Sequence, residues 1–464
     1  MQENKVEQDG KIVGDLKWDG LHGRHLYYAV VAIFSGLFLS VIDGTICNVA
    51  LPNIAKELAV SSSDSIWIIN AFQLVVIMTL LPFSSIGELY GFKKTYLCGL
   101  VLFTLGSLCC ALSWSLTSLV ASRLVQGIGA AMVMSVNGSL VRLIYPKKHL
   151  PKGFGLNATI VALASVTGPT LSAAILSVAS WPWLFAVNLP VGIVTFILAR
   201  KYLPENPVKI EGRHFDFRSA CLNAATFGLL IGCIEAFSHG IGIGWIACGF
   251  VFLVGIGTWF VITQLRQTYP MLPFDLLRIP VFSLSVVTSI LSFAAQMLAM
   301  VALPFMFHLT FHMDAVETGL LMTSWPLVIV FAAPVAGLLA TKIHPGILGA
   351  VGLFIMSIGC FLLAYVPTDT DYSGMVWRLM LCGLGFGLFQ SPNNHLLLTS
   401  APPYRSGGAS GMQATARLVG QTTGAALVAL LFHFFGDSAS HDAMLLAGIL
   451  TLCGSVVSCT RSRV

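Results

Sequence analysis

Two ionisable side chains fall inside long apolar runs of the sequence. Asp43 lies within the run 26–48, and Arg123 lies within the run 118–141. A charge in such a setting is costly and is usually functional. Burial raises the pKa of a carboxyl group, whereas a nearby cation lowers it. A carboxylate that alternates between these conditions takes up and releases a proton near neutral pH. The alternative for Asp43 is a structural ion pair, and the alternative for Arg123 is a role in helix packing.

Two further charged residues lie in apolar runs. Glu235 is close to the end of the run 218–237, where it either forms a second proton site or reaches the lipid headgroups. Arg417 lies well inside the run 408–435, where it either ties helices together or lines a substrate cavity.

Several uncharged polar and aromatic side chains offer contacts to a substrate in an otherwise apolar cavity. Three of them recur at spacings of three residues, which places them on one helix face. Aromatic rings next to a carboxylate suit lipophilic cations through cation–π attraction. The alternative is that the tryptophan anchors the membrane interface and the polar groups bond between helices. The set comprises Trp67, Asn70 and Gln73 on one helix, together with Gln296, Gln390 and Asn393.

The elements that position these residues are membrane-spanning helices. Of 464 residues, 56% are hydrophobic and 10% are charged, whereas soluble domains carry about 25% charged residues. A spanning helix needs about 20 mostly apolar residues. The sequence therefore predicts an all-α integral membrane protein with 14 transmembrane helices. We place them at 26–48, 66–87, 95–114, 118–141, 154–178, 183–203, 218–237, 243–264, 281–307, 317–340, 346–366, 376–398, 408–435 and 442–459.

The basic residues predict the orientation. With the N-terminus in the cytoplasm, all but four of the 25 Lys and Arg residues fall on the cytoplasmic side, as the positive-inside rule requires. Lys56 and Arg378 fall outside, and Arg123 and Arg417 fall within spans. We therefore expect a multi-pass protein of the bacterial inner membrane with both termini cytoplasmic. The net charge of +5 reflects this topology and requires no nucleic-acid partner.

Depth along the helices pairs Asp43 with Arg123. At a rise of 1.5 Å per residue, Asp43 lies roughly 26 Å along its outward-running helix, and Arg123 lies roughly 8 Å below the outer face. Both residues therefore belong to the outer half of a hydrocarbon layer about 30 Å thick.

Other chemistries find no support in the sequence. Residues 1–24 lack the features of a signal peptide and are expected to form a cytoplasmic tail. The 11 cysteines show no ligand or disulfide spacing, so we expect no metal site. The sequence contains no catalytic set and no phosphate-binding GxxxxGK[ST] motif. We expect no enzyme and no cofactor, with energy supplied by an ion gradient.

An internal repeat organises the chain. Gly127 and Gly129 recur as Gly383 and Gly385, and the same offset of 256 maps Pro146 onto Pro402. The offset pairs spans 4 and 5 with spans 12 and 13, so the repeat shifts by eight helices. We expect a tail at 1–24, a six-helix bundle at 25–203, linkers and two inserted helices at 204–280, and a second six-helix bundle at 281–464. Parallel repeats of this kind suit alternating access.

Four motifs carry a resemblance to a known family. They are Val41-Ile42-Asp43-Gly44-Thr45-Ile46-Cys47-Asn48-Val49-Ala50-Leu51-Pro52, Gly87-Glu88-Leu89-Tyr90-Gly91-Phe92-Lys93-Lys94, Arg123-Leu124-Val125-Gln126-Gly127-Ile128-Gly129-Ala130-Ala131, and Gly168-Pro169 followed by Trp181-Pro182-Trp183-Leu184-Phe185-Ala186-Val187-Asn188-Leu189-Pro190. Together they resemble the 14-helix drug:proton antiporter branch of the major facilitator superfamily, which includes quaternary-ammonium, methyl viologen and multidrug exporters. Within this branch, the chain resembles a little-characterised enterobacterial member. The loop motif departs from the usual pattern, with Ser84 at its first glycine and Leu89 at its arginine.

The resemblance implies roles for the motif residues. It implies that Arg123 takes part in proton coupling and that Gly168-Pro169 is an antiporter hallmark that seals a bundle interface. It also implies that a cytoplasmic loop latches the two halves through charge pairs and a helix dipole. The loop residues concerned are Gly87, Glu88, Gly91, Lys93 and Lys94.

The leading hypothesis for function is export of lipophilic, cationic drugs or toxic compounds in exchange for protons, by a monomer. A second hypothesis is export of a native metabolite such as a siderophore, an amino acid or a lipid. A third is a membrane receptor that transports nothing, which would not require Asp43 and Arg123 within the bilayer.

Overall fold

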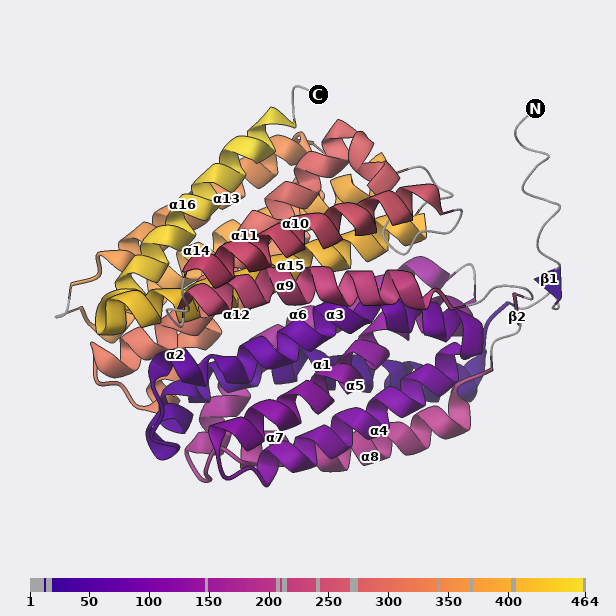
Figure 1. The fold of residues 1–464 in the computed structure, drawn as a ribbon, viewed down its shortest axis with the longest axis horizontal. Coiled ribbons are helices and arrows are strands. Elements are labelled where there is room, and N and C mark those ends of the chain that lie inside the picture. The colour runs from indigo at the N-terminus through magenta and orange to yellow at the C-terminus, as the bar shows by residue number, and fades with distance from the viewer. Residues whose placement is uncertain are drawn as a thin grey trace.

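Long helices follow the apolar runs of the sequence in the computed structural model (Figure 1). The structure describes residues 12–13, 19–146, 149–205, 209–210, 215–238, 243–267, 274–340, 342–367, 370–401 and 406–461.

Thirteen of the described helical segments are long and apolar enough to cross a membrane. Two of them are interrupted, so that α2 runs into α3 and α7 runs into α8. A further apolar helix, α9, is 22 residues long and occupies the place of the seventh predicted span. The chain is therefore an all-α membrane protein, as predicted. The helices are α1 (Gly23–Glu57), α2 (Ser62–Ser65), α3 (Trp67–Tyr90), α4 (Phe92–Ala111), α5 (Leu116–Ile144), α6 (Leu150–Leu176), α7 (Trp183–Ala186), α8 (Asn188–Tyr202), α9 (Phe217–Ser238), α10 (Ile243–Arg266), α11 (Pro280–Leu309), α12 (Ala315–Leu339), α13 (Pro345–Ala364), α14 (Tyr372–Ser400), α15 (Ser406–Phe435) and α16 (Ala439–Thr460).

The two ends of the helices differ in charge. We call the end at which α1 begins the basic end, because Lys93, Lys94, Arg142 and the tail of α8 lie there. At the opposite, acidic end, carboxylates cap helices that begin there. The side chain of Asp314 accepts from Glu317 N in the capping box of α12, and Asp371 accepts from Gly374 N at the start of α14. Acidic caps stabilise helix N-termini, which explains in local terms why acids gather at this end.

The helices form two groups. Helices α1 and α3–α8 pack on one another, as do α11–α16 (Figure 1). Helices α9 and α10 pair with each other, and α9 contacts both α3 and α15. The inserted pair thus covers a seam between the two groups.

The repeat is visible in the packing. A side chain on Gly129 would meet Phe103 N of α4 at 2.3 Å, and one on Gly385 would meet Met356 N of α13 at 2.4 Å. Gly127 and Gly383 also pack closely, on α3 and α12, because a Cβ there would lie 2.9 Å and 2.2 Å from backbone carbonyl oxygens. Small residues permit such close helix approach. The glycines that match by the offset of 256 therefore permit equivalent close helix contacts in each half.

The connection between the halves contributes a feature that the helix pattern does not predict. Strand β1 (Ile12–Val13) in the N-terminal segment pairs antiparallel with β2 (Lys209–Ile210), which follows α8. The expected tail is therefore tied to the linker that leads into α9.

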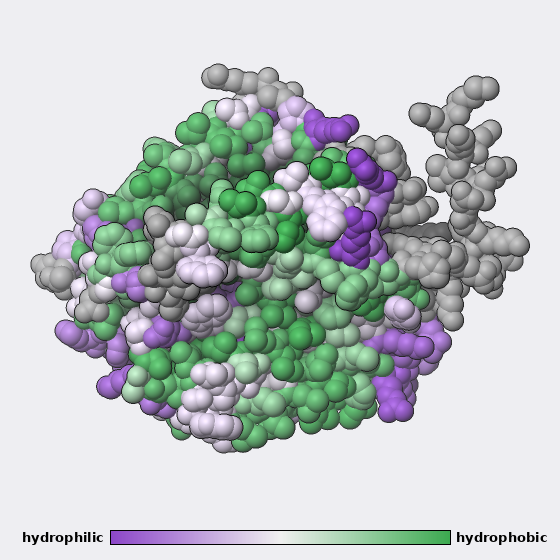
Figure 2. Space-filling model, in the orientation of Figure 1, coloured by the Kyte–Doolittle hydropathy of each residue, from purple (hydrophilic) through white to green (hydrophobic). Residues whose placement is uncertain are grey.

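The surface fits a bilayer. Figure 2 shows a broad hydrophobic band across one face, with hydrophilic residues gathered toward its two ends. Exposed aromatic and aliphatic side chains are numerous on α8 and α10, for example Ile197 at 58% and Val251 at 70%. Apolar patches of this extent mark a membrane-facing surface.

The halves meet near the acidic end. Ser63 Oγ donates to the carbonyl of Ala429 at 3.1 Å, and the hydroxyls of Thr170 and Thr323 lie 2.7 Å apart. A side chain on Gly319 of α12 would meet the Pro169 carbonyl oxygen at 2.8 Å. Each of these contacts joins a helix of the first group to a helix of the second, which closes the boundary between the halves at this end.

Candidate functional site

Asp43 and Arg123 form an ion pair inside the first half. Asp43 on α1 is 0% exposed and Arg123 on α5 is 1% exposed. Arg123 Nη1 donates to Asp43 Oδ2. The pairing predicted from helix depth is confirmed. Because both groups are enclosed, their attraction is little screened by water.

Amide side chains complete the coordination of the Asp43 carboxylate. Gln126 Nε2 donates to Asp43 Oδ1 at 2.8 Å, and Asn188 Nδ2 donates to the same oxygen at 2.9 Å. Gln126 also donates to Ser107 Oγ at 2.8 Å and accepts from Arg123 at 2.6 Å. Four helices, α1, α4, α5 and α8, thus contribute to one polar cluster. Buried charges of this kind are tolerated when their hydrogen bonds are satisfied.

The guanidinium of Arg123 has further partners. Its Nε donates to the carbonyl of Ile68 at 3.0 Å, and its Cζ lies 4.3 Å from the centre of the Phe72 ring. The centre of the Phe185 ring lies 5.6 Å from the same atom. Cation–π contacts stabilise a desolvated guanidinium. Arg123 is therefore held in place independently of Asp43.

Gln126, Asn188 and Ser107 are the residues of this cluster that reasoning from the sequence missed. Gln126 follows Arg123 by three residues, which is one helical turn, and this spacing was an available signal. Asn188 lies in the Trp-Pro motif, where α7 gives way to α8. Nothing in the spacing of Asn188 points to Asp43, 145 residues away.

The Gly168-Pro169 motif lies at two helix contacts. A side chain on Gly168 would meet Thr45 Oγ1 at 2.1 Å, which brings α6 against α1 two residues from Asp43. The next turn of α6 contacts α12 of the second half, through Ala173 and Gly319. The motif therefore links the neighbourhood of Asp43 with the boundary between the halves.

The predicted gate loop lies at the basic end. Gly91 joins α3 to α4 with φ of 113°, a conformation that favours glycine. A side chain on Gly87 would meet Val136 of α5 at 2.5 Å. Glu88 and Lys94 are exposed and Lys93 is partly exposed, so this loop presents charge at the surface.

The structure divides the polar residues predicted to contact substrate. Asn70, Gln73 and Asn393 are enclosed, whereas Trp67, Gln296, Gln390 and Arg417 are partly exposed. Gln73 Nε2 donates to Met297 Sδ across the boundary at 3.6 Å. Asn393 donates to Ser289 Oγ at 2.7 Å and accepts from Arg461, so it is occupied within the second half. The enclosed members fit the alternative of bonds between helices.

Glu235 belongs to α9, whereas Asp43 belongs to α1. Its side chain lies outside the described residues.

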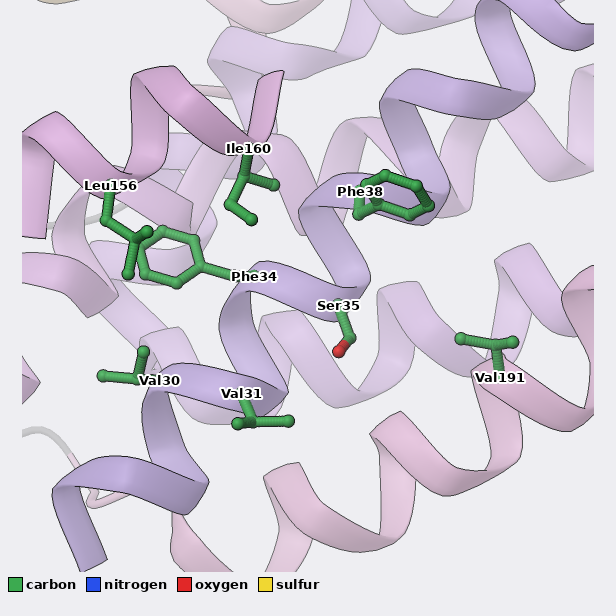
Figure 3. Close-up of a pocket in the computed structure, with 8 residues that line it drawn as sticks. All are labelled: Val30, Val31, Phe34, Ser35, Phe38, Leu156, Ile160 and Val191. Carbon is green, nitrogen blue, oxygen red and sulfur yellow. The ribbon is translucent and has the colours of Figure 1, made fainter. Parts of the chain in front are cut away.

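A pocket of about 330 Å³ lies between α1, α6 and α8 (Figure 3). It contains none of the predicted site residues, and Ser35 is the single polar side chain in its lining. An apolar lining suits a hydrocarbon chain rather than a polar ligand. The lining residues are Val30, Val31, Phe34, Ser35, Phe38, Leu156, Ile160 and Val191.

Comparisons with known proteins place this geometry in context. The sequence profile of the Major Facilitator Superfamily matches residues 33–425. The chain is 50% identical over 440 residues to the uncharacterized transporter YebQ of Escherichia coli, covering 95% of this chain and 96% of that protein.

More distant relatives have named activities. The chain is 28% identical over 420 residues to the riboflavin transporter RibZ of Clostridioides difficile, covering 90% of each. It is 29% identical over 405 residues to the multidrug resistance protein Stp of Mycobacterium tuberculosis, covering 86% of this chain and 74% of that protein. Among solved structures, a POT family transporter in complex with a thioalcohol-conjugated peptide matches with a TM-score of 0.70 at 15% identity, covering 95% of this chain and 96% of that one.

Proposed function

Because the chain belongs to the Major Facilitator Superfamily, we propose that it is a proton-coupled exporter of lipophilic small molecules. We place it in the bacterial inner membrane as a monomer with both termini in the cytoplasm, since the basic end then faces inward. The observation that carries the proposal is the enclosed Asp43–Arg123 pair, a titratable carboxylate held next to a cation within the membrane.

The pair supports a proton cycle. While Arg123 and the amides of Gln126 and Asn188 contact Asp43, its ionised form is favoured. A rearrangement that separates the carboxylate from Arg123 leaves it buried without a counter-ion, and such a carboxylate binds a proton. The Ile68 carbonyl and the Phe72 ring remain available to Arg123 when its ion pair with Asp43 separates, so the guanidinium stays held in position.

The position of Gly168-Pro169 supports coupling of this cycle to transport. The motif packs on Thr45 beside Asp43, and its following turn packs on α12. Movement of the second half against α6 therefore acts on the segment of α1 that carries Asp43. The closed boundary at the acidic end and the charged loop at Gly91 fit a cycle in which the two ends open alternately.

Drug export and metabolite export remain the two candidate activities. The similarity to a multidrug resistance protein favours the first, and the similarity to a riboflavin transporter favours the second. Direct transport assays with riboflavin and with dyes separate them. A cationic substrate, which the sequence favoured, is not required here, because the charge of Asp43 is already neutralised by Arg123 and enclosed.

The experiment uses purified protein in liposomes whose lumen is more acidic than the bath. The pH gradient should drive dye into the lumen through molecules that are inserted inside out, and a protonophore should abolish this accumulation. Asp43→Asn protein should equilibrate dye at most and should not accumulate it. Accumulation that survives the protonophore would refute proton coupling.

A further inference from the structure

A row of polar side chains on α15 is partly exposed within the second half. Gln413, Arg417 and Gln421 follow one another at intervals of four residues and so share a face. All three are partly exposed, as are positions 414, 419 and 423, whereas positions 416, 418, 420 and 422 are buried. The opening ends toward the acidic end, because positions 424, 425 and 428 are also buried.

The row lies beside the contact of α15 with α11. Gly420 and Gly424 lie against α11, where a Cβ would meet the carbonyl oxygens of Ile290 and Ala294 at 2.6 Å and 2.3 Å. Ala429 accepts its hydrogen bond from Ser63 of the first half. At about 100° per residue, Arg417 lies about 60° from the direction of Gly420 and about 120° from that of Ala429, which are opposite each other on the helix. Arg417 therefore lies beside the contact of α15 with α11.

Arg417 has no counter-ion among the described residues. Its Nε is enclosed without a hydrogen-bond partner. This contrasts with Arg123, whose carboxylate, amide, carbonyl and ring partners are all in place. The described acids of the second half, such as Asp314 and Asp371, lie at the ends of helices. An unpaired cation within a membrane protein is costly, and such groups mark the paths of ions and substrates.

Two glutamines of neighbouring helices are also partly exposed. They are Gln390 on α14 and Gln296 on α11. Gln390 lies ten residues from the basic end of α14 and Arg417 lies eleven residues from that of α15, which places them about 15 Å and 16 Å deep. The amide group of Gln390 adds hydrogen-bond donors at the level of the guanidinium.

We propose that Arg417 binds an acidic group of the transported molecule, so that the substrates include lipophilic organic anions such as carboxylates and sulfonates. The proposal rests on the proposed function of export, which supplies the molecule. A guanidinium presents a planar set of donors that matches a carboxylate or sulfonate with two parallel hydrogen bonds. The acidic group of the substrate would neutralise the charge of Arg417, as the Asp43 side chain neutralises that of Arg123.

The test uses two fluorescent probes with the same ring system. 8-Anilinonaphthalene-1-sulfonate carries an acidic group, and N-phenyl-1-naphthylamine lacks it. Binding is measured on full-length protein in nanodiscs of phosphatidylcholine, with empty nanodiscs subtracted. This lipid has no net charge, so an anionic headgroup cannot be the ligand in this assay.

Arg417→Gln should weaken binding of the sulfonate about tenfold or more, the effect of one charged hydrogen bond, and change binding of the neutral probe less than about twofold. Arg417→Lys should retain part of the sulfonate affinity, because it keeps the charge but loses the fork. The matched control is Arg378→Gln, which removes the same charge at the acidic end of α14 and should leave both affinities unchanged.

Two results would overturn the proposal. One is a ratio of sulfonate to neutral-probe affinity that is the same in Arg417→Gln as in the wild type. The other is an equal loss of both affinities together with a lower unfolding temperature, which would make Arg417 a structural residue. Transport of the neutral probe under a pH gradient is measured separately. Its absence in wild-type protein would count against proton-coupled export while leaving the binding result in force.

Discussion

Replacing each member of the Asp43–Arg123 pair, singly and together, tests whether the two charges depend on each other. Asp43→Asn keeps the shape of the side chain but leaves Arg123 without its counter-ion. Removing one partner of a buried pair costs about 3–5 kcal/mol. Arg123 retains the Ile68 carbonyl at 3.0 Å and the Phe72 ring at 4.3 Å, so we expect a loss toward the lower end, about 3 kcal/mol.

Arg123→Gln should cost at least as much, because the carboxylate then keeps only amide donors, from Gln126 and Asn188. The double variant buries neither charge. It should therefore be more stable than either single variant, which requires a coupling free energy larger than either single loss, above about 3 kcal/mol. Thermal unfolding in nanodiscs, followed by tryptophan fluorescence, should rank the wild type first, the double variant second and the single variants last. A double variant whose loss equals the sum of the two single losses would show that the pair is not coupled, and the reasoning would fail.

Three other perturbations have definite expectations. Gly168→Leu should abolish transport, because the new side chain would collide with Thr45, whose Oγ1 lies 2.1 Å from the position of a Cβ; protein that folds and transports normally would contradict the packing. Desolvation raises the pKa of Asp216, but hydrogen bonds from Ser219 and Gln267 outweigh it and hold this pKa below its usual range. The carboxylate therefore stabilises the start of α9 above about pH 4, and this stabilisation is lost as the pH falls through the folded-state pKa. Asp216→Ala should therefore cost about 1 kcal/mol at neutral pH, seen as faster hydrogen exchange in the first turn of α9 and absent in acid. In a cysteine-free background, a cysteine at Asp64 should react with an impermeant reagent from the cell exterior and one at Lys148 should not; labelling at 148 would reverse the topology.

Helix positions and the pairing of Asp43 with Arg123 could be predicted from the sequence, because both follow from apolar length and from a fixed rise per residue. The glycine repeat indicated two related halves, in which Gly129 and Gly385 make equivalent close helix contacts. These properties depend on local sequence and on regular geometry.

Side-chain partners across helices could not be predicted in the same way. Asn188 donates to Asp43, whereas Asn393 bonds with Ser289 and Arg461. Both asparagines are polar residues in apolar runs of the sequence. Which amide closes a helix contact and which one faces an opening depends on the rotation of each helix about its axis. Sequence spacing sets that rotation only relative to the same helix, so exposure of Gln390 and enclosure of Asn393, three residues apart, required the structure.

The central claim is that Asp43 carries the exchanged proton. Substrate-induced proton release from purified wild-type and Asp43→Asn protein, at matched concentration in weakly buffered detergent solution with a pH indicator, tests this claim most directly. The wild type should release protons when a transported dye is added, and the Asp43→Asn variant should bind the dye and release none. Equal release from both proteins would contradict the account and would place the coupling carboxylate elsewhere, with Glu235 the next candidate.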